Sequence, residues 1–107
     1  MRPDMLRGHL DALVLGALAS GPAHGYAVIV ALRDSTDGEF DLAEGTVYPA
    51  LHRLENQGFL VASVTEVQGR RRKVYELTAS GRRELGEQRA DWRRFSMLVT
   101  RVIGATA

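Results

Sequence analysis

The sequence predicts a mainly α-helical fold that carries one β-hairpin. Two observations support this class. Apolar residues recur at helical spacing in four separate stretches of the 107-residue chain. One stretch, residues 59–77, instead has the alternating and β-branched residues of two strands around a Gln-Gly turn. We therefore expect three helices, a hairpin and a last helix, in that order.

The composition is that of a globular protein, with 45% apolar and 25% charged residues. A chain of this length makes one domain, or one domain with an appended helix, and its small core favours help from a partner subunit. Because the chain has no cysteine, disulfides and thiolate metal sites are excluded. It has no signal peptide and no apolar run that could span a membrane, so we expect a cytoplasmic protein.

The first helix is expected to open at Pro3 and to end near Ser20, because proline suits a first helical turn. Its broad apolar stripe has room for contacts with its own domain and with another subunit. A second helix is expected to open at residues 24–26 and to end near Asp34, before a polar loop. Its expected apolar contacts are Tyr26, Ile29, Val30 and Leu32.

The third helix is expected within residues 44–60. Thr46 is its expected N-cap, which would place Pro49 in the first turn, and Gly58 suits the position that ends it. Its two sides differ: an apolar stripe faces a polar side that carries groups able to bind phosphates and base edges. The stripe is Val47, Ala50, Leu51 and Leu54, and the opposite side is Tyr48, Pro49, His52, Arg53 and Asn56. Alone, such a helix more often simply covers a core.

The hairpin adds positive charge. Its strands are expected at Phe59–Val67 and Lys73–Leu77, and an unbroken basic run, Arg70 to Lys73, lies at its tip and along its return. Because side chains alternate along a strand, about half of these cations face each side, and we expect two or three phosphate contacts. A basic run is usually a solvated surface, but the helix ahead of it favours DNA.

Three helices followed by a hairpin with a basic tip are the order of a winged helix-turn-helix, expected here over residues 1–78. In that fold the third helix enters the major groove and the hairpin, or wing, runs along the neighbouring backbone. We therefore predict a sequence-specific DNA-binding protein. Its expected DNA contacts are Thr46, Tyr48, Pro49, His52, Arg53, Asn56, Arg70, Arg71, Arg72 and Lys73.

The last helix is expected after an N-cap at Thr78, in a dimerisation segment of residues 79–107. About 25 helical residues would span about 37 Å, more than this domain needs for its own core. Apolar residues on it form a narrow seam of heptad type, which indicates a second chain. With the first helix, the expected dimer contacts are Leu6, Leu10, Leu85, Trp92, Phe95, Val99 and Val102.

Several segments together resemble the PadR family of transcriptional regulators, in its shorter subgroup with a single C-terminal helix. They are Gly21-Pro22-Ala23-His24-Gly25-Tyr26, Gly45-Thr46-Val47-Tyr48-Pro49, Arg53-Leu54-Glu55 with Gly58, Arg72–Thr78 with Gly81, and Trp92. The resemblance implies a homodimer that binds a palindromic operator, usually as a repressor. It also implies release by a small molecule at the dimer interface, often a phenolic or planar aromatic compound.

Family members that bind drugs sandwich them between interface tryptophans, and Trp92 is the matching position. The expected effector-binding residues are therefore Trp92, Phe95, Val99 and Met5. An aromatic residue on a helix seam is, however, more often packing than a ligand platform. We expect Trp92 to pack at the dimer interface, and stacking on an effector stays an open alternative.

Three other functions have weaker support in the sequence. The first is sensing of a divalent metal such as zinc, which the sequence favours less than an aromatic effector. Its weak candidate ligands are His9 and Asp11, or the acidic loop Asp34–Glu44. Catalysis lacks support, because the chain has no cysteine nucleophile, no phosphate-cradling glycine motif and no obvious His–carboxylate relay. A winged-helix module that binds protein rather than DNA is the remaining rival, but it would not need four adjacent cations. No cofactor is required by any of these patterns.

Overall fold

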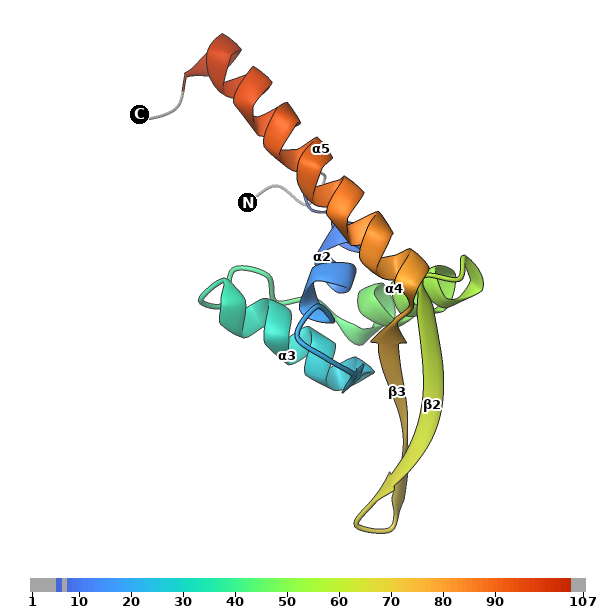
Figure 1. Ribbon diagram of the computed structural model, residues 1–107. Helices are drawn as coiled ribbons and strands as arrows, with labels where there is room; N and C mark the ends of the chain where they lie inside the picture. Colours follow the sequence, from blue (N-terminus) through green and yellow to red (C-terminus); the bar gives the residue numbers. More distant parts are fainter. Residues whose placement is uncertain (1–5, 7, 105–107) are drawn as a thin grey trace.

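The computed structural model describes residue 6 and residues 8–104. Helices α2, α3 and α4 gather into one body, the hairpin projects from it, and α5 extends away in the opposite direction (Figure 1). The molecule is elongated, with extents of 53 × 28 × 20 Å. The elements are α2 (Leu10–Ala17), β1 (Ala23–His24), α3 (Gly25–Ser35), α4 (Glu44–Asn56), β2 (Leu60–Val67), β3 (Arg70–Leu77) and α5 (Ala79–Ile103).

Helix α2 is shorter than the sequence predicts. Leu6 is also helical, but residues 8–9 form a turn, so α2 begins only at Leu10 and ends at Ala17. Pro3 and Met5 lie outside the described residues. Helix α3 begins as expected, because Nδ1 of His24 accepts a hydrogen bond from the backbone N–H of Ala27 at 3.2 Å and so caps the helix. The apolar contact expected from Tyr26 is wrong: its side chain is 51% exposed.

Helix α4 has the predicted apolar stripe and the predicted end. Gly58 has φ +82°, and the N–H groups of Gly58 and Phe59 bond to carbonyls of the last turn, which is a Schellman motif. The predicted start is wrong. Ala43 occupies the N-cap position without a side-chain cap, so Thr46 lies inside the first turn and Pro49 inside the helix, where proline removes one backbone hydrogen bond.

The hairpin is longer than predicted, and a third strand joins it. The turn residues Gln68 and Gly69 both have positive φ, which is typical of a tight hairpin turn, and β3 already begins at Arg70. Strand β1 pairs antiparallel with β3, with His24 opposite Val74, so the sheet order is β1-β3-β2. The expected two-stranded wing is therefore part of a three-stranded sheet.

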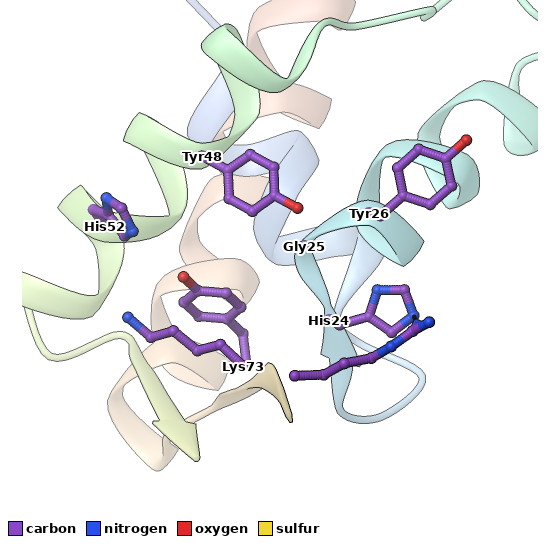
Figure 2. A pocket seen from close by; sticks show the side chains of 8 residues that line it. His24, Gly25, Tyr26, Tyr48, His52 and Lys73 are labelled. Atoms are coloured by element: carbon purple, nitrogen blue, oxygen red, sulfur yellow. Dashed lines mark hydrogen bonds between the residues drawn. The ribbon is translucent and has the colours of Figure 1, made fainter. Parts of the chain in front are cut away.

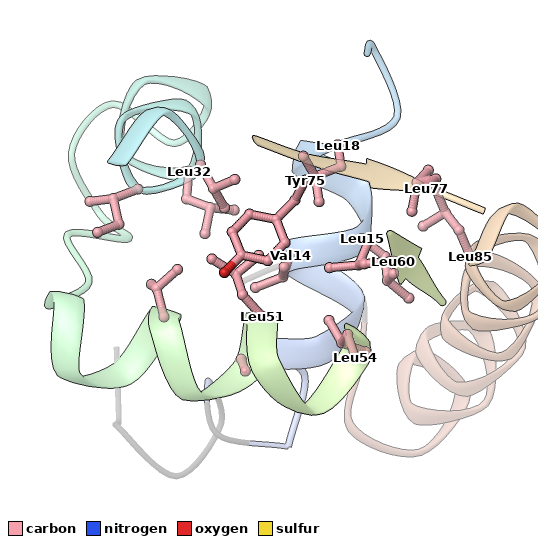
Figure 3. Packing of buried hydrophobic residues seen from close by; sticks show 14 residues of the cluster. Val14, Leu15, Leu18, Leu32, Leu51, Leu54, Leu60, Tyr75, Leu77 and Leu85 are labelled. Atoms are coloured by element: carbon pink, nitrogen blue, oxygen red, sulfur yellow. The ribbon is translucent and has the colours of Figure 1, made fainter. Parts of the chain in front are cut away.

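The core lies where α2, α3 and α4 meet the base of the sheet (Figure 3). Leu15 of α2 and Leu18, which follows the helix, pack with Leu51 of α4 and with Tyr75, the largest of the fully buried side chains. Leu85 of α5 is also buried in this core. It was expected at the dimer seam, but the first turns of α5 pack on their own domain.

The junction of β3 and α5 is tightly built. Thr78 caps α5 by accepting from the N–H of Gly81 at 2.9 Å, and its hydroxyl donates to the Gly58 carbonyl at 2.7 Å. A side chain at Gly81 would overlap the carbonyl of Phe59, so this position needs glycine. Among the helices that the structure describes, none is both long and apolar enough to cross a membrane.

Candidate nucleic-acid interface

The side of α4 opposite the core is an open surface. Thr46, Pro49, His52 and Asn56 are exposed on it, and these side chains lie where the sequence predicts them. Gly45 shares this face, and a Cβ placed there would meet open space. This surface therefore combines three side chains that can hydrogen-bond, Thr46, His52 and Asn56, with a stretch of backbone at Gly45 that has no side chain above it.

Tyr48 is half-buried at the edge of this face. Its ring packs directly over Gly25 at the start of α3, where any larger residue would clash with it. Burial raises the pKa of the Tyr48 phenol, and the negative charge of Glu44 and the nearby Tyr75 raise it further. The hydroxyl therefore stays neutral and can donate a hydrogen bond at physiological pH.

Arg53 forms an ion pair with Asp11 of α2, a partner 42 residues away in the sequence. The hydrogen bond to Asp11, followed by that carboxylate's charge, raises the pKa of Arg53. Both side chains are partly exposed, at 47% and 37%, so the pair contributes less than about 1 kcal/mol to stability. Arg53 thus ties α4 to α2, and its contact with DNA remains a prediction.

The strand register sorts the wing cations onto two faces. Arg70 and Arg72 stand opposite Val67 and Thr65 on one face. Arg71 and Lys73 stand opposite Glu66 and Val64, on the face that continues into the core. The alternation expected from the sequence is therefore present.

Two of these cations have partners within the chain. Nζ of Lys73 donates to Oε1 of Glu55 on α4 at 3.1 Å, and this bond is the main reason why the pKa of Lys73 is raised. The same ammonium lies 5.3 Å from the centre of the Tyr75 ring. Nη1 of Arg72 lies 2.9 Å from Nε2 of His24. The wing base is thereby fixed to α4 on one side and to the start of α3 on the other.

A hollow of about 430 Å³ opens between these elements (Figure 2). Figure 2 shows Tyr48 and His52 on α4 at one side and His24, Gly25 and Tyr26 at the start of α3 at the other, with Lys73 below. The Tyr48 ring points toward Gly25, whereas the hydroxyl of Tyr26 points away from Tyr48. The sequence treats residues 24–26 only as a helix start and does not place them in a site. The tight fit of Tyr48 over Gly25 requires the folded arrangement. The lining residues are His24, Gly25, Tyr26, Tyr48, His52, Arg72, Lys73 and Tyr75.

A second exposed surface, which is apolar, lies along α5. Trp92, Phe95 and Val102 are 53%, 56% and 84% exposed, and Ile103, which the sequence analysis missed, is also exposed on this side. The His9 ring meets Trp92 edge-on, with centroids 5.1 Å apart, and Phe95 lies 6.3 Å from it. The remaining seam positions, Leu6, Leu10 and Val99, are partly buried within the chain, and Met5 lies outside the described residues.

The weak candidate metal ligands are both engaged elsewhere. His9 contacts Trp92, and Asp11 pairs with Arg53. Across residue 6 and residues 8–104, no three His, Cys, Asp or Glu side chains gather as a metal site.

Residues 14–87 match the transcriptional regulator PadR-like family, well over half of the chain. The chain belongs to the PadR-like family. Proteins of this family are transcriptional regulators rather than enzymes, which agrees with the class expected from the sequence.

This PadR-like chain is 31% identical over 93 residues to an uncharacterised protein of Lysinibacillus sphaericus, covering 86% of this chain and 85% of that one. A transcriptional regulator from Clostridium thermocellum has a similar structure, with a TM-score of 0.87 and 27% identity over 94% of this chain and 98% of that one. Bacillus subtilis PadR, solved in complex with operator DNA, gives a TM-score of 0.66 at 28% identity. That match covers 73% of this chain and 45% of the Bacillus protein.

Proposed function

We propose that the protein is a homodimeric repressor that binds a palindromic operator and is released by a small aromatic effector. The observation that carries the DNA-binding part is the convergence of three elements on one surface. The open side of α4, the start of α3 and the base of the wing all line the same hollow. The similarity to Bacillus subtilis PadR, which was solved with operator DNA, supports this assignment.

In this proposal α4 enters the major groove with its open side. His52 and Asn56 can hydrogen-bond to base edges, and Gly45 lets the helix start approach the duplex closely. The wing follows the backbone, where two or three of its cations contact phosphates regardless of sequence. Four adjacent cations also argue against the rival function, a winged-helix module that binds another protein.

A homodimer would carry two copies of this DNA-binding surface, one on each subunit. The exposed apolar side of α5, with Trp92, Phe95 and Val102, is the kind of surface that a second copy covers. A two-fold dimer places its recognition helices in successive major grooves, about 34–36 Å apart, and so selects a palindromic site.

The proposed effector would bind beside Trp92. Its indole and the Phe95 ring offer exposed aromatic faces on which a planar compound could stack. The divalent-metal alternative has less support, because no three His, Cys, Asp or Glu side chains gather as a metal site within residue 6 and residues 8–104.

The test is an electrophoretic mobility shift with the purified protein and the DNA immediately upstream of its own gene. We expect a discrete shifted band that survives competition by unrelated duplex, and footprinting should map it to a palindrome. The logarithm of affinity should fall linearly with the logarithm of salt concentration, because phosphate contacts release counterions. If the protein bound that DNA no better than unrelated duplex, and eluted from heparin at low salt, the proposal would fail.

A further inference from the structure

His24 faces two hydrogen-bond donors that one imidazole cannot satisfy together. Its Nδ1 lies 3.2 Å from the backbone N–H of Ala27, which is a donor. Its Nε2 lies 2.9 Å from Nη1 of Arg72, which is also a donor and keeps its protons at any physiological pH. A neutral imidazole accepts at one nitrogen and donates at the other, and a protonated one accepts at neither.

Each protonation state of His24 therefore leaves donors facing each other. If Nδ1 accepts from Ala27 and caps α3, the proton sits on Nε2 and points at the Arg72 guanidinium. If Nε2 instead accepts from Arg72, the proton moves to Nδ1 and the helix cap is lost. An acceptor placed beside Nε2 and Nη1 would relieve this conflict and keep the cap.

The surroundings favour an anion as that acceptor. None of the described residues that line the hollow carries a carboxylate, and the phenol of Tyr48 adds a further hydroxyl donor. Two carboxylates act on lining residues from outside the hollow: Glu55 accepts from Lys73, and the charge of Glu44 raises the pKa of Tyr48. The hollow also opens at the start of α3, where the helix dipole favours negative charge.

We infer that this hollow binds one phosphate group, held between Nε2 of His24 and the guanidinium of Arg72. This inference rests on the proposed function, because an operator backbone would bring such a group to the junction of α4 and the wing. A free phosphorylated small molecule has the same chemistry and would use the same two donors. The volume of about 430 Å³ accommodates either source.

The backbone source is tested by replacing single operator phosphates with neutral methylphosphonate linkages, one position at a time. In the wild-type protein, we expect one position in each half-site to lose about tenfold in affinity, as when a hydrogen bond to a charged group is removed. For the variants Arg72→Ala and His24→Asn, the same methylphosphonate replacement should lower the affinity less than about twofold, because the contact is already missing. Asparagine retains the ability to cap α3, so the second variant should keep the fold, which thermal unfolding checks.

Arg70→Ala is the matched control. Arg70 lies on the same strand and the same face as Arg72, two positions nearer the tip, and carries the same charge. In this variant, a methylphosphonate linkage at the position assigned to the hollow should still lower the affinity about tenfold relative to the variant's own affinity for unmodified operator.

The free source is tested with inorganic phosphate, followed through the His24 ring signals in NMR at constant ionic strength against chloride. Saturable shifts that disappear in Arg72→Ala would show that the hollow takes a free phosphate group. If the wild-type protein bound operator DNA, yet no linkage was coupled to His24 or Arg72 and phosphate gave no such shifts, the inference would be wrong while the proposed function stood. Loss of DNA binding by the wild-type protein would instead count against the proposed function.

Discussion

Arg53 shows how a single residue acquires a role that its position in a pattern does not reveal. Helical spacing places it on the side of α4 away from the core, and the structure leaves it partly exposed there. Its partner Asp11 lies on α2, and a contact between residues so far apart depends on how the helices pack. The guanidinium can therefore serve the ion pair, DNA, or each in turn.

Replacing Asp11 with asparagine separates these roles. Asp11→Asn removes a negative charge and frees Arg53, so operator affinity should rise several-fold, while stability falls by less than about 1 kcal/mol because the pair is partly exposed. Arg53→Ala should weaken operator binding by about 1–3 kcal/mol. Fluorescence anisotropy with labelled operator measures both. If neither variant changed the affinity, Arg53 would be a structural residue alone.

Gly45 is a helical glycine for which the described residues give no packing reason. A Cβ there meets open space, in contrast to Gly25 and Gly81, where it would clash. Gly45→Ala should therefore raise stability by about 0.5–1 kcal/mol, since alanine is the better helix former, and should weaken operator binding if DNA approaches this backbone. Thermal unfolding and anisotropy measure the two effects.

Gly16→Ala is the control for this change, because Gly16 is also helical, exposed and free of neighbours at its Cβ. It should gain stability and keep the operator affinity. If Gly45→Ala bound the operator as tightly as the wild-type protein, DNA would not approach the α4 backbone closely at this position.

At the level of elements, the sequence predicts best where the physics is local. The apolar stripe of α4, the Schellman end at Gly58, the Gln-Gly turn and the Thr78 cap each depend on a few neighbouring residues, and the structure confirms them. The start of α4 at Ala43 has no side-chain cap and hence no signal to find. The basic residues that begin β3 lack the apolar alternation that marks a strand.

Strand β1 explains why the hollow itself could not be predicted. It has two residues, too few for any pattern, and it becomes a strand only because β3 lies beside it. That pairing brings His24 next to Arg72, 48 residues away. The individual side chains on α4 and the wing were foreseeable from spacing and charge, whereas the contribution of α3 depends on this tertiary contact.

Thr78 attaches the start of α5 to the rest of the domain. Its hydroxyl both caps α5 and donates to the carbonyl of Gly58, so it links the end of α4 to the start of α5. Thr78→Ala should lower the free energy of unfolding by about 1–2 kcal/mol in urea titration. Thr65→Ala, on the exposed wing, should change it by less than about 0.5 kcal/mol. Equal effects would mean that the link contributes nothing specific.

For the whole molecule, the outer half of α5 is the feature that bears most on association between copies. Leu85 anchors the first turns of this helix in the core, whereas Val102 and Ile103, near its other end, are 84% and 78% exposed. A monomer would present this side to water. A small core and an unpartnered apolar helix side together favour association between copies.

Charging the outer end of α5 should therefore disrupt association without unfolding the domain. We expect the double variant Val102→Asp, Ile103→Asp to sediment as a monomer and to bind a full palindrome much more weakly, because the two half-sites are no longer engaged together. Met97→Asp is the control: Met97 is 47% exposed but lies on the opposite side of α5, so this variant should stay dimeric. A wild-type protein that sedimented as a monomer at micromolar concentration would contradict the proposed assembly.

The same charged variant decides whether the proposed effector site belongs to one chain or to two. Trp92 is the single tryptophan, so quenching of its fluorescence by planar phenolic compounds reports directly on this surface. If two copies enclose the compound, quenching should be saturable in the wild-type protein and should weaken at least tenfold in Val102→Asp, Ile103→Asp, which leaves Trp92 and Phe95 intact. Undiminished quenching in the monomer would assign the site to the His9–Trp92–Phe95 cluster of one chain, and binding could then not report on assembly. Without saturable quenching by any phenolic compound tested, Trp92 would be a packing residue, and release of the operator would need another signal.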